Sequence, residues 1–488
     1  MVESIRNEET LDPEDWDQLR SLGHRMMDDM MDYQQNIRST PFLPPTQEAI
    51  TELMAPLNEE GYGAEKTYEM FHQNFLPHVW KYIKPQFWGF VIGTGSPFGM
   101  LSDMLSSGMN NADTTVSVSE PVYRQAINWI KEMLDYPEEA GGVFVSGGSE
   151  ANFTGLAVAR NTKAEVDMKT EGMQGVNRKM TLYCSEETHD CTDRSVELLG
   201  LGSEALRWIP TDDECRIKLD ALKKAITKDR EQNYHPFCVI GNAGTVNTGA
   251  FDDLNAIADL CSKENLWFHV DGAFGSWVKL SETHRGLADG LGRADSLAVD
   301  LHKWMSMPYA IGCTLVKDKV SHFSTFVYGH DAEYLKSGMS EWGDIITNPL
   351  NLSLALSRAA YSFKAYMLLR AYGRKKYSRI IQKNLDDIDY LAELIRKEPD
   401  LELMAPVASN IACFRYNVNG LSESDLEIVN RQILGELWKI NLMMIADTTV
   451  KGKYMLRACN VNHRTQRQDF EWLIEEVKKA GEKTKSKL

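Results

Sequence analysis

Short apolar runs alternate with amphipathic stretches along residues 141–316. The runs occupy 143–145, 180–184, 237–240, 266–270, 296–299 and 313–316, with helical periodicity between them, for example over 219–227 and 254–264. Strands that are buried on both faces read as continuous apolar runs, and helices between them connect parallel neighbours. The pattern therefore predicts an α/β fold, built on a mostly parallel sheet that helices cover on both faces.

The segments on either side of this region follow other patterns. A helical pattern over 14–38 ends before the prolines of 41–45, and it predicts an N-terminal helical arm that lies against a partner subunit. Downstream, 352–372 and 377–396 predict two long helices with a break at Gly373. Strand patterns at 411–416, 442–445 and 454–457 then alternate with helical patterns at 423–439 and 468–480, which predicts a smaller C-terminal α+β domain. We expect three regions: an arm and dimer-contact segment at 1–85, a large domain at 86–372 and a small domain at 373–488.

Composition excludes several classes of partner. The chain has 488 residues and a net charge of −17, so nucleic acid and anionic membrane surfaces are poor partners. It has no apolar stretch of membrane-spanning length, and its polar, acidic N-terminus argues against a secretory signal. The eight cysteines lack the spacing of a zinc or redox site. We therefore expect a cytoplasmic protein with reduced thiols and no metal.

Lys303 and Asp271 are the most informative pair in the chain. Lys303 follows Asp271 by 32 residues, and each comes directly after an apolar run. Pyridoxal phosphate (PLP) requires an amine that holds it as a Schiff base and a carboxylate that keeps its pyridine nitrogen protonated, so that the ring accepts electrons. The pair therefore predicts a PLP site, with Lys303 as the anchor and Asp271 as the partner of the pyridine nitrogen.

A glycine-rich turn at 146–149 supplies a third element. An apolar strand runs into this turn, and a helical pattern follows over 150–160. Backbone N–H groups at a helix start, with the hydroxyls of Ser146 and Ser149, suit a phosphate group, although a glycine-rich cap without a ligand is the alternative. In parallel sheets ligands bind beyond the carboxyl ends of the strands. The polar residues that follow apolar runs, and that one site could collect, are Ser146, His189, Thr245, Asp271 and Lys303.

With these residues in view, the chain resembles the group II PLP-dependent decarboxylases, the family of the aromatic-L-amino-acid, glutamate and histidine decarboxylases. The likeness extends over about 85–474. It rests on VSGGSEAN at 145–152, YCSEETHDC at 183–191, GNAGTVNTGAFDDL at 241–254, HVDGAFG at 269–275, DLHKW at 300–304 and LRACNVNHRTQRQDF at 456–470. The resemblance implies PLP fold type I, a homodimer with its active site at the subunit interface, and decarboxylation of an L-amino acid to the amine and carbon dioxide.

The resemblance also assigns roles to individual residues. Lys303 would hold the cofactor and Asp271 its pyridine nitrogen, while Ala273 and His189 would lie on the two faces of the ring. Thr245 would lie near the ring, with a turn hydroxyl as its alternative. Arg457 matches a family arginine that holds the substrate carboxylate, and an exposed partner for an acid is the alternative. The group expected around the phosphate is Ser146, Gly147, Gly148, Ser149, Asp300 and His302.

The sequence departs from the family in a loop. Many members carry a tyrosine there that is thought to return a proton to the substrate carbon, but residues 335–349 contain none, and Tyr328 and Tyr334 precede this stretch. We expect His189 to supply the proton, or else a side reaction with oxygen to gain ground. An oxidative decarboxylase that makes an aldehyde is therefore one alternative. Another PLP-dependent lyase and a cofactor-free binding protein are two more.

The segment expected to face the substrate is mixed in character. Phe90 and Val91 could clasp an aromatic ring, although aromatic residues are often simply buried. Residues 110–117 are polar, and Asp113 there could favour a side chain with a donor or a cation. We expect an aromatic substrate, with a basic amino acid that meets Asp113 as the rival. Capping of a local turn is the other role open to Asp113.

Overall fold

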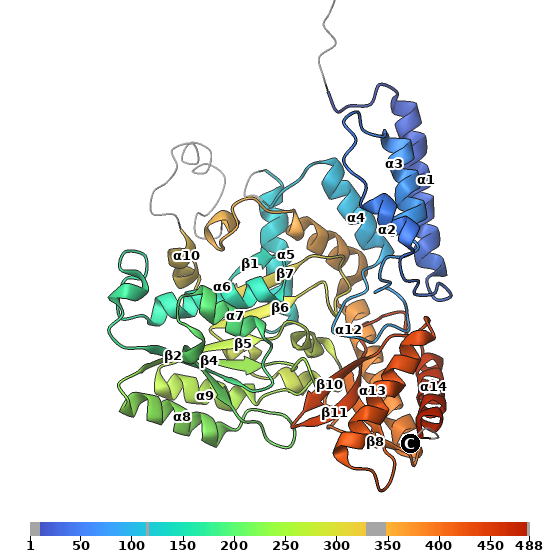
Figure 1. Ribbon diagram of the computed structural model, residues 1–488. Helices are drawn as coiled ribbons and strands as arrows, with labels where there is room; N and C mark the ends of the chain where they lie inside the picture. Colours follow the sequence, from blue (N-terminus) through green and yellow to red (C-terminus); the bar gives the residue numbers. More distant parts are fainter. Residues whose placement is uncertain (1–9, 114–116, 328–347, 486–488) are drawn as a thin grey trace, which may run out of the picture. The chain divides into compact units, whose positions relative to one another are not determined.

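The computed structural model describes residues 10–113, 117–327 and 348–485, and the chain divides into two compact units, 1–84 and 85–488. The described part of the first unit is helical (Figure 1). It contains α1 (Trp16–Asn36), α2 (Gln47–Leu53), α3 (Ala64–Met70) and the π-helical turn η1 (Phe71–Phe75). The carboxylate of Asp15 accepts hydrogen bonds from the N–H groups of Asp17 and Gln18 and so caps α1. The helix predicted over 14–38 is confirmed, whereas the three-region division stays a prediction.

The second unit is built on a seven-stranded sheet of order β1-β7-β6-β5-β4-β2-β3. Its strands are β1 (Gly141–Val145), β2 (Met180–Ser185), β3 (Leu206–Ile209), β4 (His235–Asn242), β5 (Trp267–Asp271), β6 (Ser296–Asp300) and β7 (Gly312–Val316). Neighbours among β2 to β6 pair in parallel, whereas β7 is antiparallel to both β1 and β6. The predicted mostly parallel sheet is confirmed, and each of the six apolar runs forms a strand.

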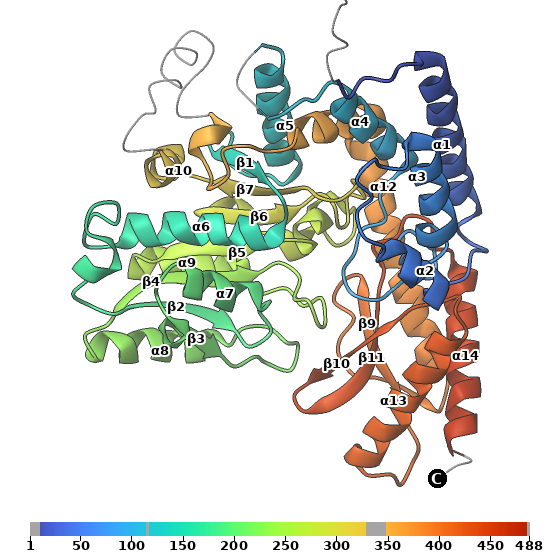
Figure 2. The ribbon, with the colours of Figure 1, turned by 45° about the horizontal axis from the view of Figure 1, so that its top comes forward.

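Helices cover both faces of this sheet (Figure 2). Alternate residues of one strand belong to different apolar clusters, because successive side chains point to opposite faces. Leu182 of β2 packs in a cluster with α6 (Gly148–Lys163) and α7 (Cys191–Leu198), and Tyr183 packs in a cluster with α8 (Leu219–Glu231) and α9 (Leu254–Glu264). The fold is therefore an α/β sandwich of helix, sheet and helix.

Further helices follow in the same unit. They are α4 (Pro97–Gly108), α5 (Ser119–Met133), α10 (Lys319–Phe326) and α12 (Tyr361–Lys397), with short turns η2 (Gly172–Gly175), η3 (Ser203–Ala205), η4 (Gly275–Leu280), η5 (Arg285–Ala288), η6 (Leu291–Arg293) and η8 (Pro349–Asn351). The predicted break at Gly373 is confirmed by its φ of 66° inside α12. The predicted helix start at 352 is wrong, because α12 begins only at Tyr361. Before it, the guanidinium of Arg358 donates to the hydroxyl of Ser353 and to the carbonyl of Phe144, and these bonds favour an irregular path.

A four-stranded antiparallel sheet of order β10-β11-β9-β8 closes the described part of the chain. Its strands are β8 (Leu401–Leu403), β9 (Ile411–Tyr416), β10 (Ala446–Val450) and β11 (Lys453–Cys459), and its helices are α13 (Glu423–Lys439) and α14 (Arg467–Lys485). This agrees with the predicted α+β arrangement. The strand predicted at 442–445 is wrong, because β10 begins at Ala446; within that run Met444 forms only an isolated bridge with Phe87.

Strand register places the carboxyl ends of several strands together. Gly312 of β7 lies opposite Val145 at the end of β1 and opposite Asp300 at the end of β6. Asn242 at the end of β4 lies opposite Asp271 at the end of β5. Residues that follow these four strands are thereby brought to one edge of the sheet. No helix within 10–113, 117–327 or 348–485 is long and apolar enough to cross a membrane, and all eight cysteines are free and buried.

Candidate active site

A cavity of about 570 Å³ opens at this edge of the sheet. It gathers most of the residues that the sequence singles out. The predicted residues that line it are Phe90, Val91, Ser146, Gly147, Gly148, Ser149, His189, Asp271, Ala273, Asp300, His302, Lys303 and Arg457. Thr245 and Asp113 are not among the residues that line it. Lining residues that sequence reasoning missed are Glu150, Asn152, Cys191, Asn242, Gly244, Val246, Asn247, Phe274, Ala446 and Asp447.

The glycine turn at 146–149 lets the backbone pack closely against the carboxylate of Asp300 at the cavity. A Cβ atom on Gly148 would lie 2.8 Å from Oδ2 of Asp300, and one on Gly312 would lie 2.7 Å from Cα of Gly147. Glycine is therefore needed at both positions if Asp300 is to pack against the start of α6. The first N–H groups of a helix have no partner within the helix, so this end can bind an anion.

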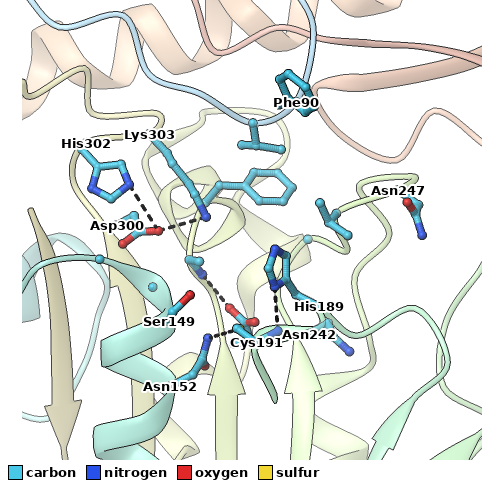
Figure 3. A pocket seen from close by; sticks show the side chains of 18 of the residues that line it. Phe90, Ser149, Asn152, His189, Cys191, Asn242, Asn247, Asp300, His302 and Lys303 are labelled. Atoms are coloured by element: carbon cyan, nitrogen blue, oxygen red, sulfur yellow. Dashed lines mark hydrogen bonds and ion pairs between the residues drawn. The ribbon is translucent and has the colours of Figure 1, made fainter. Parts of the chain in front are cut away.

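The two predicted serines of this turn differ in what they contact. Ser146 donates both its N–H, at 2.8 Å, and its hydroxyl, at 2.7 Å, to Oε2 of Glu150. Ser149 lies at the first turn of α6, beside the cavity (Figure 3). A phosphate bound at this turn could therefore contact the helix start and Ser149 directly. Ser146 could contact it only after giving up its hydrogen bonds to Glu150.

Lys303 lies at the centre of the cavity beside a buried acid (Figure 3). Its Nζ is 2.9 Å from Oδ2 of Asp300, a residue that is 1% exposed, and Nε2 of His302 is 3.7 Å from the same oxygen. Burial lowers the pKa of Lys303, but Asp300 and then Asp271 outweigh it, and the pKa is raised above its usual value. Burial lowers the pKa of His302. The amine is thus held as a cation by Asp300, and the charge of Asp271 adds to this effect.

Asp271 ends β5 and lines the cavity. Its Oδ1 accepts a hydrogen bond from the N–H of Ala273 at 3.1 Å. Near it, Cys191 accepts from Nδ2 of Asn152 at 3.5 Å, and the other atom of that amide contacts Nε2 of His269 at 2.8 Å. Burial raises the pKa of the Cys191 thiol to about 12, with Asp271 adding to the shift, and burial lowers the pKa of His269 to about 4. The Cys191 thiol and the His269 ring beside this carboxylate are therefore uncharged near pH 7, and the charge that acts on Asp271 is that of Lys303.

His189 presents one ring nitrogen to the backbone and leaves the other for a ligand. Its Nδ1 accepts from the N–H of Cys191 at 3.0 Å. In the neutral ring the hydrogen must then sit on Nε2. This ring and Ala273 both line the cavity, and Cβ of Ala273 lies 3.2 Å from where a Cβ atom on Gly148 would be. A flat aromatic cofactor would find an amine, a carboxylate, a helix start and a ring face there, and PLP is the cofactor that uses all four.

Thr245 serves the turn rather than the cavity. Its hydroxyl accepts from the N–H of Ala250 at 3.1 Å and lies 3.0 Å from the hydroxyl of Thr248, and the residue is 1% exposed. Its neighbours Gly244 and Val246 line the cavity instead. The hydrogen bonds thus favour the turn hydroxyl that the sequence offered as the alternative role.

Asp113 is buried away from the cavity of its own chain. Its carboxylate accepts hydrogen bonds from the N–H of Ser362, at 3.1 Å and 3.2 Å, and from the Ser362 hydroxyl, in the first turn of α12. Burial raises the pKa of Asp113 to about 6. The contact is that of a helix cap supplied from a distant segment, so it supports neither the substrate contact nor the cap of a local turn that the sequence offered.

We expect Asp113→Ala to lower stability without changing substrate preference. Loss of the carboxylate leaves two donors of Ser362 without their partner, at a cost of about 1–2 kcal/mol. Thermal unfolding and the relative rates on several amino acids should be measured on the same preparation. A changed substrate preference at unchanged stability would show instead that Asp113 contacts the substrate.

The loop without a tyrosine lies largely outside the described residues. Tyr328, Tyr334 and the stretch 335–347 all fall there, and the same holds for residues 114–116 beside Asp113. Within the described ranges, no group of three His, Cys, Asp or Glu residues could hold a metal ion.

Comparison with known proteins agrees with this geometry. Residues 48–417 match the family described as the pyridoxal-dependent decarboxylase conserved domain. An aromatic-L-amino-acid decarboxylase of Bacillus atrophaeus is 32% identical over 473 residues, which cover 96% of each chain. A phenylacetaldehyde synthase of Arabidopsis thaliana is 26% identical over 460 residues, which cover 92% of each chain. Among solved structures, Oryza sativa TDC with PLP and tryptamine is 24% identical and covers 97% of this chain and 99% of its own, with a TM-score of 0.87.

Proposed function

This chain belongs to the pyridoxal-dependent decarboxylase family and uses PLP, and from that premise we propose that it decarboxylates an aromatic L-amino acid to the amine and carbon dioxide. When bound, PLP supplies an electron sink for the electron pair that departing carbon dioxide leaves behind. The residues of the chain have the tasks of holding the cofactor, fixing protons and shaping the substrate end.

Three residues carry the chemistry in this proposal. Lys303 is the amine that holds the cofactor and yields it to the substrate amine. Asp271 holds a proton on the pyridine nitrogen, a task that suits a carboxylate whose neighbours Cys191 and His269 are uncharged. His189 moves a proton at Nε2, the nitrogen that its bond to the Cys191 N–H leaves free.

The character of the substrate end is the observation that carries the substrate class. Phe90, Val91, Val246, Phe274 and Ala446 give this end an apolar surface. Its polar members are already engaged: the Asn247 amide bonds to Glu187 and Thr448, and the Arg457 guanidinium bonds to backbone carbonyls. The acid next to this wall, Asp447, already pairs with Arg431 at 3.6 Å. An apolar wall whose acid is paired favours an aromatic side chain over a basic one. The buried position of Asp113 weakens the basic rival in the same way.

An oxidative decarboxylase that releases an aldehyde is the second candidate. Two observations favour it: residues 335–349 contain no tyrosine, and a phenylacetaldehyde synthase is among the relatives. If no acid protonates the substrate carbon promptly, oxygen can intercept the electrons, and hydrogen peroxide and ammonia then accompany the aldehyde. The two candidates share every residue described above and differ only in the fate of that carbon.

The experiment is a carbon dioxide release screen with the PLP-loaded protein over phenylalanine, tyrosine, tryptophan, histidine, lysine and glutamate. We expect release from at least one of the first three at a rate at least tenfold above that from lysine or glutamate. Peroxide and ammonia should be measured in the same tubes. An amine without peroxide supports the simple decarboxylase, equimolar peroxide supports the aldehyde synthase, and preference for lysine or glutamate contradicts the aromatic assignment.

A cytoplasmic homodimer with its active site at the subunit interface completes the proposal. The N-terminal unit exposes large apolar side chains, including Trp16, Leu19 and Met26 of α1, Leu53 of α2 and Phe75 of η1. A second copy would bury such side chains, and closed dimers are the commonest assembly of soluble proteins. Light scattering should give a mass near twice the 55.3 kDa of one chain; a mass of one chain would contradict this.

A further inference from the structure

Arg457 uses most of its guanidinium to bind backbone carbonyls. It lies in β11, opposite Ala446 of β10 and Cys413 of β9, and it is 3% exposed. Its Nε donates to the carbonyl of Asn247 at 3.0 Å, its Nη2 to that of Val246 at 2.6 Å and its Nη1 to that of Phe90 at 3.2 Å. Three of the five N–H donors of the side chain are thereby engaged.

These carbonyls belong to two separate segments that line the cavity. Phe90 is 57% exposed and has a φ of 56°, a left-handed conformation that a bulky residue keeps only when its surroundings hold it. The segment before it is attached to the small sheet, because Trp88 donates to Met444 at 2.7 Å and accepts from Cys459 at 2.9 Å. Val246 and Asn247 come instead from the loop after β4 of the large sheet.

The second segment is fixed by side chains as well. Nδ2 of Asn247 donates to Glu187 at 3.0 Å, and its Oδ1 accepts from the hydroxyl of Thr448 on β10 at 2.8 Å. Cys413 contacts the carbonyl of Asn247 at 3.4 Å. Asn247 therefore connects its own loop after β4 to two other parts of the chain: the segment that carries His189, and the small sheet. Arg457 extends this connection to Phe90.

We propose that Arg457 is a positioning residue that sets the gap between Phe90 and the Val246–Asn247 segment, and thereby limits which substrate rings enter. The proposal rests on the proposed function for the nature of the ring. It differs from the role that the resemblance implies, in which this arginine holds the substrate carboxylate. The two roles make opposite predictions for a ligand that has no carboxylate.

The test therefore compares each amino acid with its amine. Dissociation constants of tryptophan and tryptamine, and of tyrosine and tyramine, should be measured by calorimetry on the parent, Arg457→Lys and Arg457→Gln, each loaded with PLP and reduced with borohydride so that the amino acids are not turned over. Lysine keeps the charge but cannot reach three carbonyls with fixed geometry. We expect both variants to weaken amine and amino acid by the same factor, roughly ten- to a hundredfold, and to alter the preference between indole and phenol ligands.

A readout without ligand tests the positioning directly. In the protein before addition of any amino acid, the amides of residues 88–91 and 246–248 should exchange hydrogen for deuterium at least tenfold faster in Arg457→Lys than in the parent. Arg415→Lys is the matched control, because Arg415 is 5% exposed on the neighbouring strand β9 and pairs with Glu402 and Glu423 away from the cavity. It should leave exchange in both segments unchanged.

A second variant leaves the charge intact. Thr448→Val keeps the shape of the side chain and removes its bond to Asn247, so it should weaken amine and amino acid equally by a few-fold. If Arg457→Gln weakens binding of the amino acid but not of the amine, and Arg457→Lys restores that binding, Arg457 holds the carboxylate and the proposal is overturned. Unchanged exchange and binding in Arg457→Lys would also overturn it. Failure of every aromatic substrate would overturn the proposed function, but the exchange result would still stand.

Discussion

Replacement of Lys303 with alanine should abolish the visible absorption band of the lysine-bound cofactor and nearly all turnover. Lys303 is the lysine that lines the described cavity, and its Nζ is 2.9 Å from a buried acid that holds it in place. An amine elsewhere in the chain cannot form the same bond, because a covalent anchor must reach the cofactor in the correct geometry. Loss of at least three orders of magnitude in turnover is the expected scale for removal of a covalent catalyst.

The measurement combines spectra, turnover and chemical trapping. Purified Lys303→Ala should be incubated with PLP, reduced with borohydride and analysed by mass spectrometry of its peptides. Lys279→Ala is the control, because Lys279 is also nearly buried and pairs with Asp289 at 2.9 Å outside the cavity. That control should retain the absorption band even if it unfolds at a lower temperature. Cofactor trapped on Lys303→Ala with turnover intact would contradict the assignment.

The sequence predicts the large sheet well because its strands are buried on both faces. The pattern does not predict strand β3, because β3 is not buried along its whole length. It is the outer strand of the sheet, and Arg207 and Trp208 are partly exposed within it, so the run Leu206–Ile209 does not read as apolar. The helix expected from 352 failed because Arg358 and Asp113 supply tertiary hydrogen bonds that no local pattern reveals.

Some residues of the candidate site could likewise be found from the sequence, and others could not. Lys303, Asp271 and the glycine turn could be found because each follows a strand directly, and strand ends meet at one edge of a parallel sheet. Cys191 and Asn152 lie inside motifs that the sequence singled out, but their contact spans 39 positions along the chain and depends on how α6 and α7 pack. Asn247 and Arg457 are farther apart still. Their connection joins two sheets, which no single periodic pattern describes.

Asp271→Asn should keep much of the bound cofactor and lose most of the catalysis. An amide has nearly the shape of the carboxylate and can still accept from the Ala273 N–H, so the end of β5 should fold unchanged. It cannot hold a proton on the pyridine nitrogen by charge. The lost interaction of about one to a few kcal/mol corresponds to a decrease in turnover of roughly tenfold to several hundredfold.

The matched control for this change is a carboxylate that contacts the other end of β5. Asp295, the residue before β6, accepts from the N–H of Phe268 in β5 at 2.8 Å, outside the cavity, so Asp295→Asn tests what an amide costs at a half-buried carboxylate bonded to β5 without touching the cofactor. Turnover per bound PLP should fall in Asp271→Asn and stay near the parent value in Asp295→Asn. Because the comparison is made per bound cofactor, it separates catalysis from retention. Near-normal turnover per bound PLP in Asp271→Asn would remove the carboxylate from the chemistry and leave it a structural role at the end of β5.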